Sequence, residues 1–344
     1  MKPVRLKVGP TRKLPIWEKA KKEKRKNRII RIAFLLIVLI ILVNVAIRVP
    51  TIYHVLSHPF ERLPNDKEKL ADLDTSFRTN LLLASYEKER GLGDLAIASY
   101  EPADRRLTVL FFDLSENRKL QMMANHVFEK EGVVGLQRFI SMQTAVPVDR
   151  YLAFESSDLT FTTESMLNSY KEIKSANFFL KVLSFKRSLN KTLKTNLTSA
   201  EILNLIWRIR GAKFEEKDQL YLNKIGSGDL ASRETTEELS NLFVDRKISD
   251  EGAAVTVRNS SGKAGLGTVL ARYLGNLGVT IVAVETGEES SQKNFLLEKN
   301  SKPQLEKRLA SIISFNKKKA EKEDFSGDIL IIVGEEAIRM LTLP

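Results

Sequence analysis

Residues 32–47 read IAFLLIVLIILVNVAI and carry no charge, which constrains the fold more than any other stretch of the chain. Extended back to residue 29, with Arg31 able to reach the membrane interface, the segment approaches the roughly 20 residues that a helix needs to cross a bilayer. Residues 1–31 hold 13 Lys and Arg against two acids, and such clusters stay on the cytoplasmic side. We therefore expect a basic cytoplasmic tail over residues 1–28, a signal anchor over residues 29–48, and everything after it outside the membrane.

Two alternatives exist for this apolar segment, a buried helix of a soluble protein and a cleaved signal peptide. The flanking basic cluster argues against the first, and a long n-region without a small-x-small cleavage site argues against the second. The tail also accounts for nearly all of the net charge of +12. A nucleic-acid-binding domain would carry its positive charge on a folded face, so we expect a membrane partner and no nucleic acid.

The remainder of the chain has the patterns of a stalk and two folded domains. It contains no cysteine, so its stability must come from core packing without disulfides or thiolate metal sites. Residues 49–76 hold three prolines and many charges and are typical of a stalk. Residues 77–246 interleave strand-like runs (80–86, 95–102 and 106–114) with stretches of helical spacing (135–142 and 198–210), which predicts an α/β domain.

A smaller α/β module is expected over residues 253–336, with the order β-α-β-α-β. Strands are predicted at residues 254–259, 279–284 and 328–333, and helices at residues 266–274 and 303–314. The charged run NKKKAEKED, residues 316–324, is expected to be a solvated loop or helix end.

Glycines 262, 265 and 267 lie between the first strand and the first helix of this module, where many proteins hold a phosphate. Their order does not match G-x-G-x-x-G, and no Lys-Ser/Thr pair follows them as in a P-loop. We interpret them as a tight strand-to-helix turn that lets the helix pack closely on the strands. Anion binding at the helix start remains a minor alternative.

The same module resembles the LytR C-terminal domain. The resemblance rests on a strand ending V-x-N, a glycine loop with G-L at the helix start, the run G-V-T-I-V and a final I-I-V-G. The matching positions are Val257, Asn259, Gly262, Gly265, Leu266, Gly278 and residues 331–334. That domain usually follows a LytR-CpsA-Psr catalytic domain behind a single anchor helix, and this chain has the same order of parts.

Residues 77–246 resemble such a catalytic domain in the order and spacing of short segments. These are NLLLASY (80–86), GDLAIASYEP (93–102), NHVFEKEG (125–132), VPVDRYLAF (146–154) and LTSAEILNLIWRIRG (197–211). The resemblance implies transfer of a phosphate-linked glycopolymer from a polyprenyl pyrophosphate carrier to the cell wall. It places Asp94 at a metal-binding position, with Mg²⁺ as the cofactor if the site is active, and Arg208 and Arg210 at two catalytic arginine positions. The alternatives without a catalytic role are that Asp94 caps a backbone N–H, and that of Arg208 and Arg210 one is solvated and the other is paired to Glu215 or Glu216.

Other charges that pyrophosphate chemistry requires are missing from the matching positions. Tyr86 replaces an Asp, Leu92 and Leu114 each replace an Arg, and Ser115, Lys213 and Glu216 replace further expected residues. If the alignment with the family is shifted, Asp104, Arg105, Arg106, Asp113 or Arg118 could supply part of the missing charge of the site.

We expect a cell-envelope protein that binds or assembles wall polymer with a degenerate pocket; the alternative is an active phosphotransferase. Two or more acids with three or more arginines converging on one apolar pocket would favour the enzyme.

Overall fold

The computed structural model describes residues 72–87, 91–155, 160–175, 178, 193–224, 233–319 and 324–338. These all belong to one compact unit, Pro59–Pro344. The predicted tail, the predicted anchor and nearly all of the predicted stalk lie outside the described residues. None of the helices in the described ranges has the length and apolar character to cross a bilayer.

The first domain is an α/β domain built on a six-stranded mixed sheet, as expected from the sequence. Its strand order is β5-β4-β1-β2-β3-β6. The strands are β1 (Thr79–Glu87), β2 (Gly91–Glu101), β3 (Arg106–Phe112), β4 (Arg150–Glu155), β5 (Leu193–Thr195) and β6 (Gln219–Tyr221). Strands β1, β2 and β3 are neighbours and antiparallel, whereas β4 and β6 join β1 and β3 in parallel.

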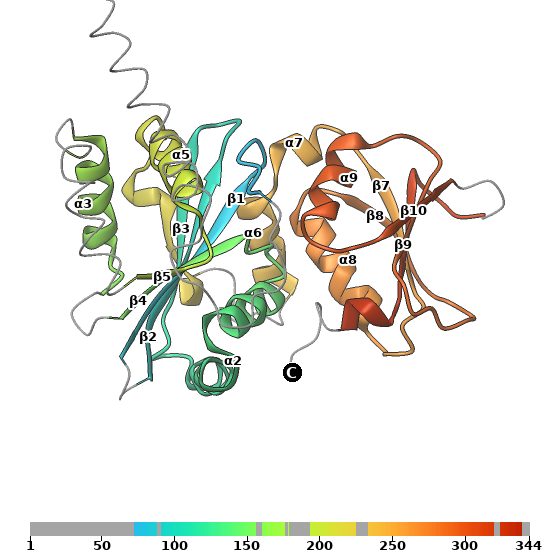
Figure 1. The fold of residues 1–344 in the computed structure, drawn as a ribbon, viewed down its shortest axis with the longest axis horizontal. Helices are drawn as coiled ribbons and strands as arrows, with labels where there is room; N and C mark the ends of the chain where they lie inside the picture. Colours follow the sequence, from blue (N-terminus) through green and yellow to red (C-terminus); the bar gives the residue numbers. More distant parts are fainter. Residues whose placement is uncertain are drawn as a thin grey trace, which may run out of the picture. The chain divides into compact units, whose positions relative to one another are not determined.

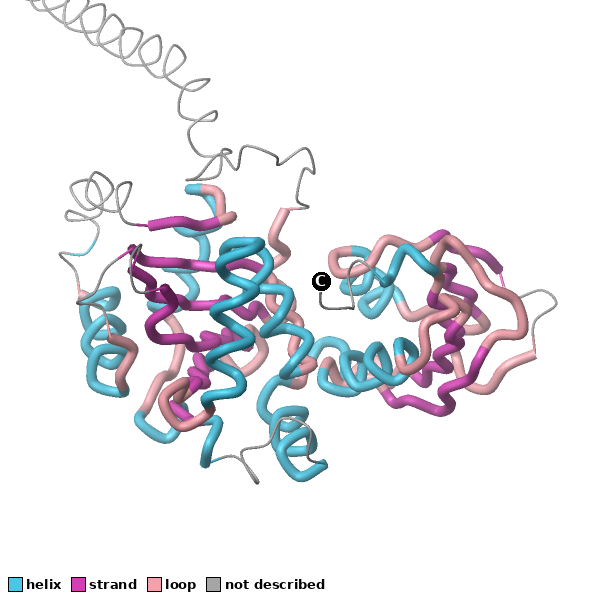
Figure 2. The backbone as a smooth tube through the Cα atoms, turned by 90° about the horizontal axis from the view of Figure 1, so that it is seen from below, coloured by secondary structure: helices cyan, strands magenta, loops and turns pink. Residues whose placement is uncertain are grey.

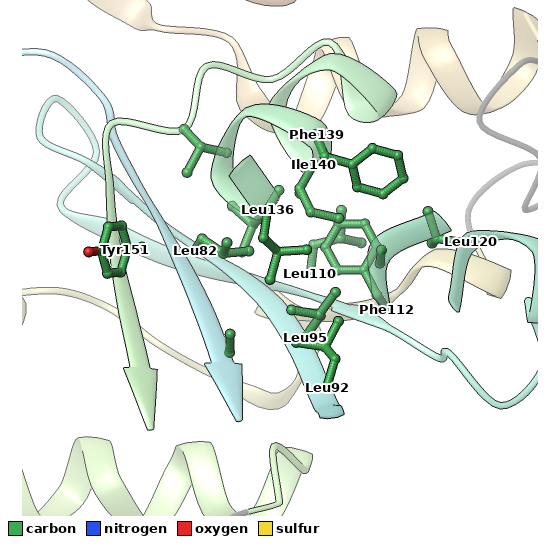
Figure 3. Close-up of a cluster of buried hydrophobic side chains, with 14 of the residues drawn as sticks. Leu82, Leu92, Leu95, Leu110, Phe112, Leu120, Leu136, Phe139, Ile140 and Tyr151 are labelled. Atoms are coloured by element: carbon green, nitrogen blue, oxygen red, sulfur yellow. The ribbon is translucent and has the colours of Figure 1, made fainter. Parts of the chain in front are cut away.

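Helices cover both faces of this sheet (Figure 1). One face carries α2 (Arg118–Thr144) and α6 (Arg233–Phe243), and its core includes Leu82, Leu110, Leu136 and Phe139 (Figure 3). The other carries α3 (Thr163–Lys174) and α5 (Ser199–Arg210), which pack on each other and on the sheet. Strand residues alternate between the two cores, so each face buries apolar side chains, as expected for a sheet between helix layers.

Helix α2 is longer than the helix predicted for residues 135–142, and it is kinked. Gly132 interrupts it with φ 66° and ψ −156°, a conformation that is far easier for glycine than for other residues. The N-terminal half begins at Asn117, whose side chain accepts a hydrogen bond from the Leu120 N–H. The segment NHVFEKEG, residues 125–132, therefore forms the first half of this helix.

The second domain is a five-stranded sheet with the order β10-β9-β11-β7-β8. The predicted β-α-β-α-β series is present as β7 (Ala254–Asn259), α8 (Leu266–Asn276), β8 (Thr280–Thr286), α9 (Pro303–Ala310) and β11 (Ile329–Val333). Two short strands were not predicted, β9 (Phe295–Glu298) and β10 (Asn316–Lys319). The expectation of a loop or helix end at residues 316–319 was wrong, because these lysines form an exposed edge strand paired to β9. Figure 2 shows the strands and helices of both domains along the backbone.

The glycine loop before α8 is a turn, as the sequence predicted. Gly262 and Gly265 have positive φ angles of 72° and 81°. A Cβ on Gly267 would lie 3.1 Å from the Asn259 Cβ and 3.3 Å from a Val284 methyl, so glycine there lets α8 approach the strands. The Asn259 side chain bonds the Lys263 carbonyl and the Ser261 N–H, which holds the loop in place.

Buried polar contacts join the two domains. Arg308 on α9 forms an ion pair with Asp149, which precedes β4, at 2.7 Å, and both side chains are less than a tenth exposed. Asn276 at the end of α8 donates to the carbonyls of Thr144 and Ala145 at the end of α2. Phe77, which precedes β1, is buried in the core of the second domain. These contacts predict that the domains unfold together.

Candidate functional site

Asp94 lies near the start of β2, and its carboxylate ties two segments together. Its Oδ2 accepts a hydrogen bond from the Phe161 N–H at 2.8 Å, just before α3. Its own N–H donates to the Ser85 hydroxyl on β1 at 2.8 Å. Among the described residues there is no group of three or more His, Asp or Glu that could hold a metal ion. The observed contact of Asp94 is the one expected of a carboxylate that caps a backbone N–H.

Arg208 and Arg210 lie in the last turn of α5. The Arg208 Nε donates to the Asn204 side chain at 3.2 Å. The Arg210 guanidinium donates to the carbonyls of Lys174 and Ser175 at the C-terminal end of α3. A cation at a helix C-terminus is favourable because the unpaired carbonyls there carry partial negative charge. The Arg210 contacts hold α5 against α3, whereas the Arg208 contact lies within α5, and neither arginine is bonded to Asp94.

Three positions where the resemblance implies charge are apolar and buried. Tyr86, Leu92 and Leu114 are 4%, 7% and 6% exposed and belong to the core that α2 covers. The Tyr86 ring packs against Phe128 with centroids 5.3 Å apart. Figure 3 shows Leu92 among the packed side chains of this core. An arginine at the position of Leu92 or Leu114 would have to be buried among apolar side chains, at a cost of several kcal/mol. The Tyr86 hydroxyl, by contrast, lies 3.4 Å from the Glu155 carboxylate.

A charged cavity of about 110 Å³ lies at the other end of the first sheet. It is lined by Arg78, Glu101, Asp104, Arg106, Thr108, Lys217, Asp218, Leu220, Asn241, Leu242, Val244 and Arg246. Asp94 and Glu101 are seven residues apart on β2, which corresponds to about 23 Å along a strand. The cavity and Asp94 are therefore separate places on the molecule.

The charges of this cavity are arranged in ion pairs. Arg78 pairs with Glu101 at 3.0 Å, and this pair is nearly fully buried. The Arg106 Nε donates to Asp218 at 2.6 Å, and Arg246 pairs with Asp104 at 3.3 Å.

Arg78 is held more tightly than the other two arginines. Its guanidinium also donates to the Ser99 hydroxyl and to the carbonyls of Leu242 and Val244. Burial lowers the pKa of Arg78, and the attraction of Glu101 opposes that shift.

The numbers of arginines and acids here reach the threshold that would favour an enzyme, but the arrangement differs from the one expected. The site was expected to be apolar, and this cavity is lined by charges that already neutralise one another. A pyrophosphate would have to displace three carboxylates to gain the three guanidinium groups. Sequence reasoning had noted Asp104 and Arg106 only as neighbours of the expected site. It missed Arg78, Glu101 and Asp218, which come from separate segments and carry no local motif.

The remaining positions of the expected site lie on two other segments of the first domain. Lys213 and Glu216 are exposed on the segment between α5 and β6. Asp113 accepts hydrogen bonds from the Ser115 hydroxyl and N–H in the turn before α2, and the Ser115 bond is the main reason that the pKa of Asp113 is lowered. Asp113 and Ser115 therefore stabilise a turn, and the backbone of Lys213 pairs with that of Arg106.

Comparison with known proteins places the second domain in a family. Residues 252–336 match the family model described as LytR cell envelope-related transcriptional attenuator. The resemblance predicted from the sequence is confirmed. The second domain is a LytR C-terminal domain. A comparison with curated proteins gave no match.

Solved structures similar to the chain include LytR-CpsA-Psr proteins. Bacillus subtilis TagV has 13% identity and a TM-score of 0.32, covering 43% of this chain and 84% of that one. TagT bound to LI-WTA has 11% identity and a TM-score of 0.28, with 44% and 81% covered. The LytR-CPS2A-psr family protein YwtF (TagT) with bound octaprenyl pyrophosphate lipid has 12% identity and a TM-score of 0.27, with 44% and 80% covered. TM-scores below 0.5 establish neither residue correspondence nor a ligand for this chain.

Proposed function

We propose that the chain is a membrane-anchored, extracytoplasmic cell-envelope protein that binds or assembles wall polymer without phosphotransfer at Asp94. The LytR C-terminal domain supports a role in the cell envelope. The uncharged segment 32–47 behind a basic tail supports a single anchor with the N-terminus inside. Polyprenyl phosphate lipid and wall glycopolymer are the partners that the sequence resemblance implies.

The observation that carries the loss of catalysis is the packing of Tyr86, Leu92 and Leu114 in an apolar core. Transfer from a pyrophosphate carrier needs cations that spread the developing charge, and one transition-state donor alone is worth about 2.7–4 kcal/mol. Asp94 is engaged by a backbone N–H, and none of its observed partners is a cation. Such a site lacks the charges needed to bind a metal pyrophosphate.

An active phosphotransferase is the second candidate, and one observation favours it. The cavity that contains Arg78, Arg106 and Arg246 has three arginines and three acids, which is the composition expected of a pyrophosphate site. The Arg106 and Arg246 side chains are about half exposed, so a ligand that displaces their carboxylate partners would make two guanidinium groups available.

The two candidates are separated with the isolated unit 59–344, whose cores are enclosed within it. Octaprenyl pyrophosphate is added with and without Mg²⁺, and binding is followed by thermal stability and lipid release by mass spectrometry. We expect no Mg²⁺-dependent release, and retention of purified wall polymer in a pulldown.

Release that depends on Mg²⁺ would overturn the proposal, and two variants would then locate the site. Loss of release in Asp94→Asn would place it at β2, whereas loss in Arg106→Gln would place it in the charged cavity. Asp113→Ala serves as the matched control, because that exposed carboxylate caps a turn and lines neither place.

A further inference from the structure

Helix α5 carries an exposed apolar stripe. Leu203 is 39% exposed and Trp207 is 69% exposed, and both lie on one helix face with the partly exposed Ile206 between them. The opposite face, with Ile202, Leu205 and Ile209, packs on the sheet. A tryptophan this exposed, one turn from an exposed leucine, is typical of a surface that contacts a partner or a membrane.

Cations gather at the C-terminal end of the same stripe. Arg208 and Arg210 end α5, and Arg210 bonds the carbonyls at the end of α3, where Lys171 and Lys174 lie. Glu172 is the acid within this part of α3. The Lys174 ammonium donates to the buried Tyr170 hydroxyl at 3.1 Å, which leaves Arg208, Arg210 and Lys171 as the cations for a partner. Three cations and one acid near an exposed tryptophan are typical of a helix surface that lies on an anionic bilayer.

Few residues of the chain separate this surface from the predicted anchor. The first described segment runs onto α5, where the Leu73 N–H donates to Glu201 at 2.8 Å and Asn204 donates to the Thr75 hydroxyl at 3.2 Å. Only residues 49–71 separate this point from the end of the predicted anchor at residue 48. Even fully extended, 23 residues reach at most about 80 Å, so a short length of chain links this surface to the predicted anchor.

We propose that the exposed face of α5 docks on an anionic phospholipid surface. Trp207 and Leu203 then enter the headgroup region, and Arg208, Arg210 and Lys171 contact lipid phosphates. The docking rests on the proposed anchor, which supplies the short tether. Docking on the membrane would explain why α5, whose sequence resembles the family helix that ends in Arg-x-Arg, carries an apolar outer face.

The test uses the fluorescence of Trp207 in the full chain. The chain has two tryptophans, Trp17 and Trp207, so Trp17→Phe leaves Trp207 as the only emitter. This variant is reconstituted in phosphatidylcholine vesicles containing phosphatidylglycerol, with or without bromine on the acyl chains. We expect Trp207 emission to shift to shorter wavelength and about half of it to be lost in brominated vesicles, since the ring lies within the interface.

Two further variants separate docking from simple anchoring. Leu203→Asp puts a charge on the stripe and should abolish most of the quenching. Met122→Asp is the matched control, because Met122 is 73% exposed on α2 and lies outside the stripe, and it should leave quenching unchanged. Arg208→Gln should lower the dependence of quenching on phosphatidylglycerol.

Flotation of the same vesicles shows whether a negative result concerns the docking of α5 or the membrane anchor. A chain that floats with the vesicles but whose Trp207 emission is the same with and without bromine would overturn the docking and leave the anchor intact. A chain that does not float would overturn the anchor and the docking with it. A wavelength shift that grows with protein concentration, without quenching by bromine, would show that a second copy covers the stripe, and would also overturn the docking.

Discussion

Replacing Arg308 tests whether the two domains form one stability unit. The Arg308 guanidinium donates to both oxygens of Asp149, at 2.7 and 3.3 Å, and to the Arg78 carbonyl at 3.2 Å. Burial acts to lower the pKa of Arg308, but attraction to Asp149 outweighs it and the pKa is raised. Within the described part of the chain, the buried Asp149 carboxylate would keep one hydrogen bond in Arg308→Ala, from the Asn80 N–H.

The expected cost of Arg308→Ala is about 3–5 kcal/mol, because removing one partner leaves an uncompensated buried charge. A urea titration of the unit 59–344 should show the midpoint falling by about 1–2 M. The neighbouring Lys307→Ala is the control, since Lys307 pairs with Asp74 at an exposed position and should cost less than about 1 kcal/mol. Asp149→Asn combined with Arg308→Met removes both charges and should recover much of the loss.

The result that would refute this reasoning is a change below about 1 kcal/mol in Arg308→Ala. A second refuting result is a separate unfolding transition for the C-terminal domain in the wild-type unit. Two probes that report on different domains make the comparison direct, because coincident transitions are the signature of one cooperative unit. Trp207 fluorescence follows the first domain, and exchange of the α8 amides follows the second.

Three further changes test the fold. Leu136→Ala, in the centre of the α2 core, should cost about 2–5 kcal/mol in urea unfolding, because the fully buried side chain leaves a cavity. Gly278→Ala should destabilise by more than about 1 kcal/mol, since φ is +96° there and a Cβ would lie 2.9 Å from a Val244 methyl. Burial raises the pKa of Asp74, but hydrogen bonds led by Lys307 dominate and lower it to about 2. That carboxylate therefore contributes stability above about pH 4 that is lost as the pH falls through 2, and Asp74→Asn should flatten the acid limb of a stability–pH curve.

Much of the fold was predictable because its strands and helices have strong apolar periods. The series from β7 to β11 was found within a few residues, with its glycine turn. Strand β10 was missed because its sequence, one asparagine and three lysines, shows no alternation; it forms by pairing with β9, and lysines are typical of sheet edges that resist further pairing. The length of α2 was missed because Gly132 is unfavourable in a regular helix, whereas here it forms a kink and the helix continues.

The site was harder to predict because its chemistry depends on contacts between distant segments. The sequence located Asp94 on β2 and the arginines at the end of α5. It could not show that Asp94 accepts the Phe161 N–H, a contact across 67 positions of sequence. The charged cavity depends on Arg78, Glu101, Asp218 and Arg246, which come from four separate segments that meet only in the folded chain.

Arg208 and Arg210 show how one residue pattern supports different functions. Two hypotheses place the arginines of α5 beside a lipid phosphate. In the first, this is the pyrophosphate of a carrier lipid in a catalytic pocket; in the second, it is the headgroups of the bilayer. A pocket would need these side chains to point inward with Asp94, but Arg210 bonds the end of α3 and Trp207, one turn before it, is exposed. The residues that pack inward from α5 are apolar. The contact of Arg210 with the end of α3 and the exposure of Trp207 therefore support the proposed attachment to a membrane surface. The Trp207 quenching experiment tests that attachment, and the lipid-release experiment tests the chemistry.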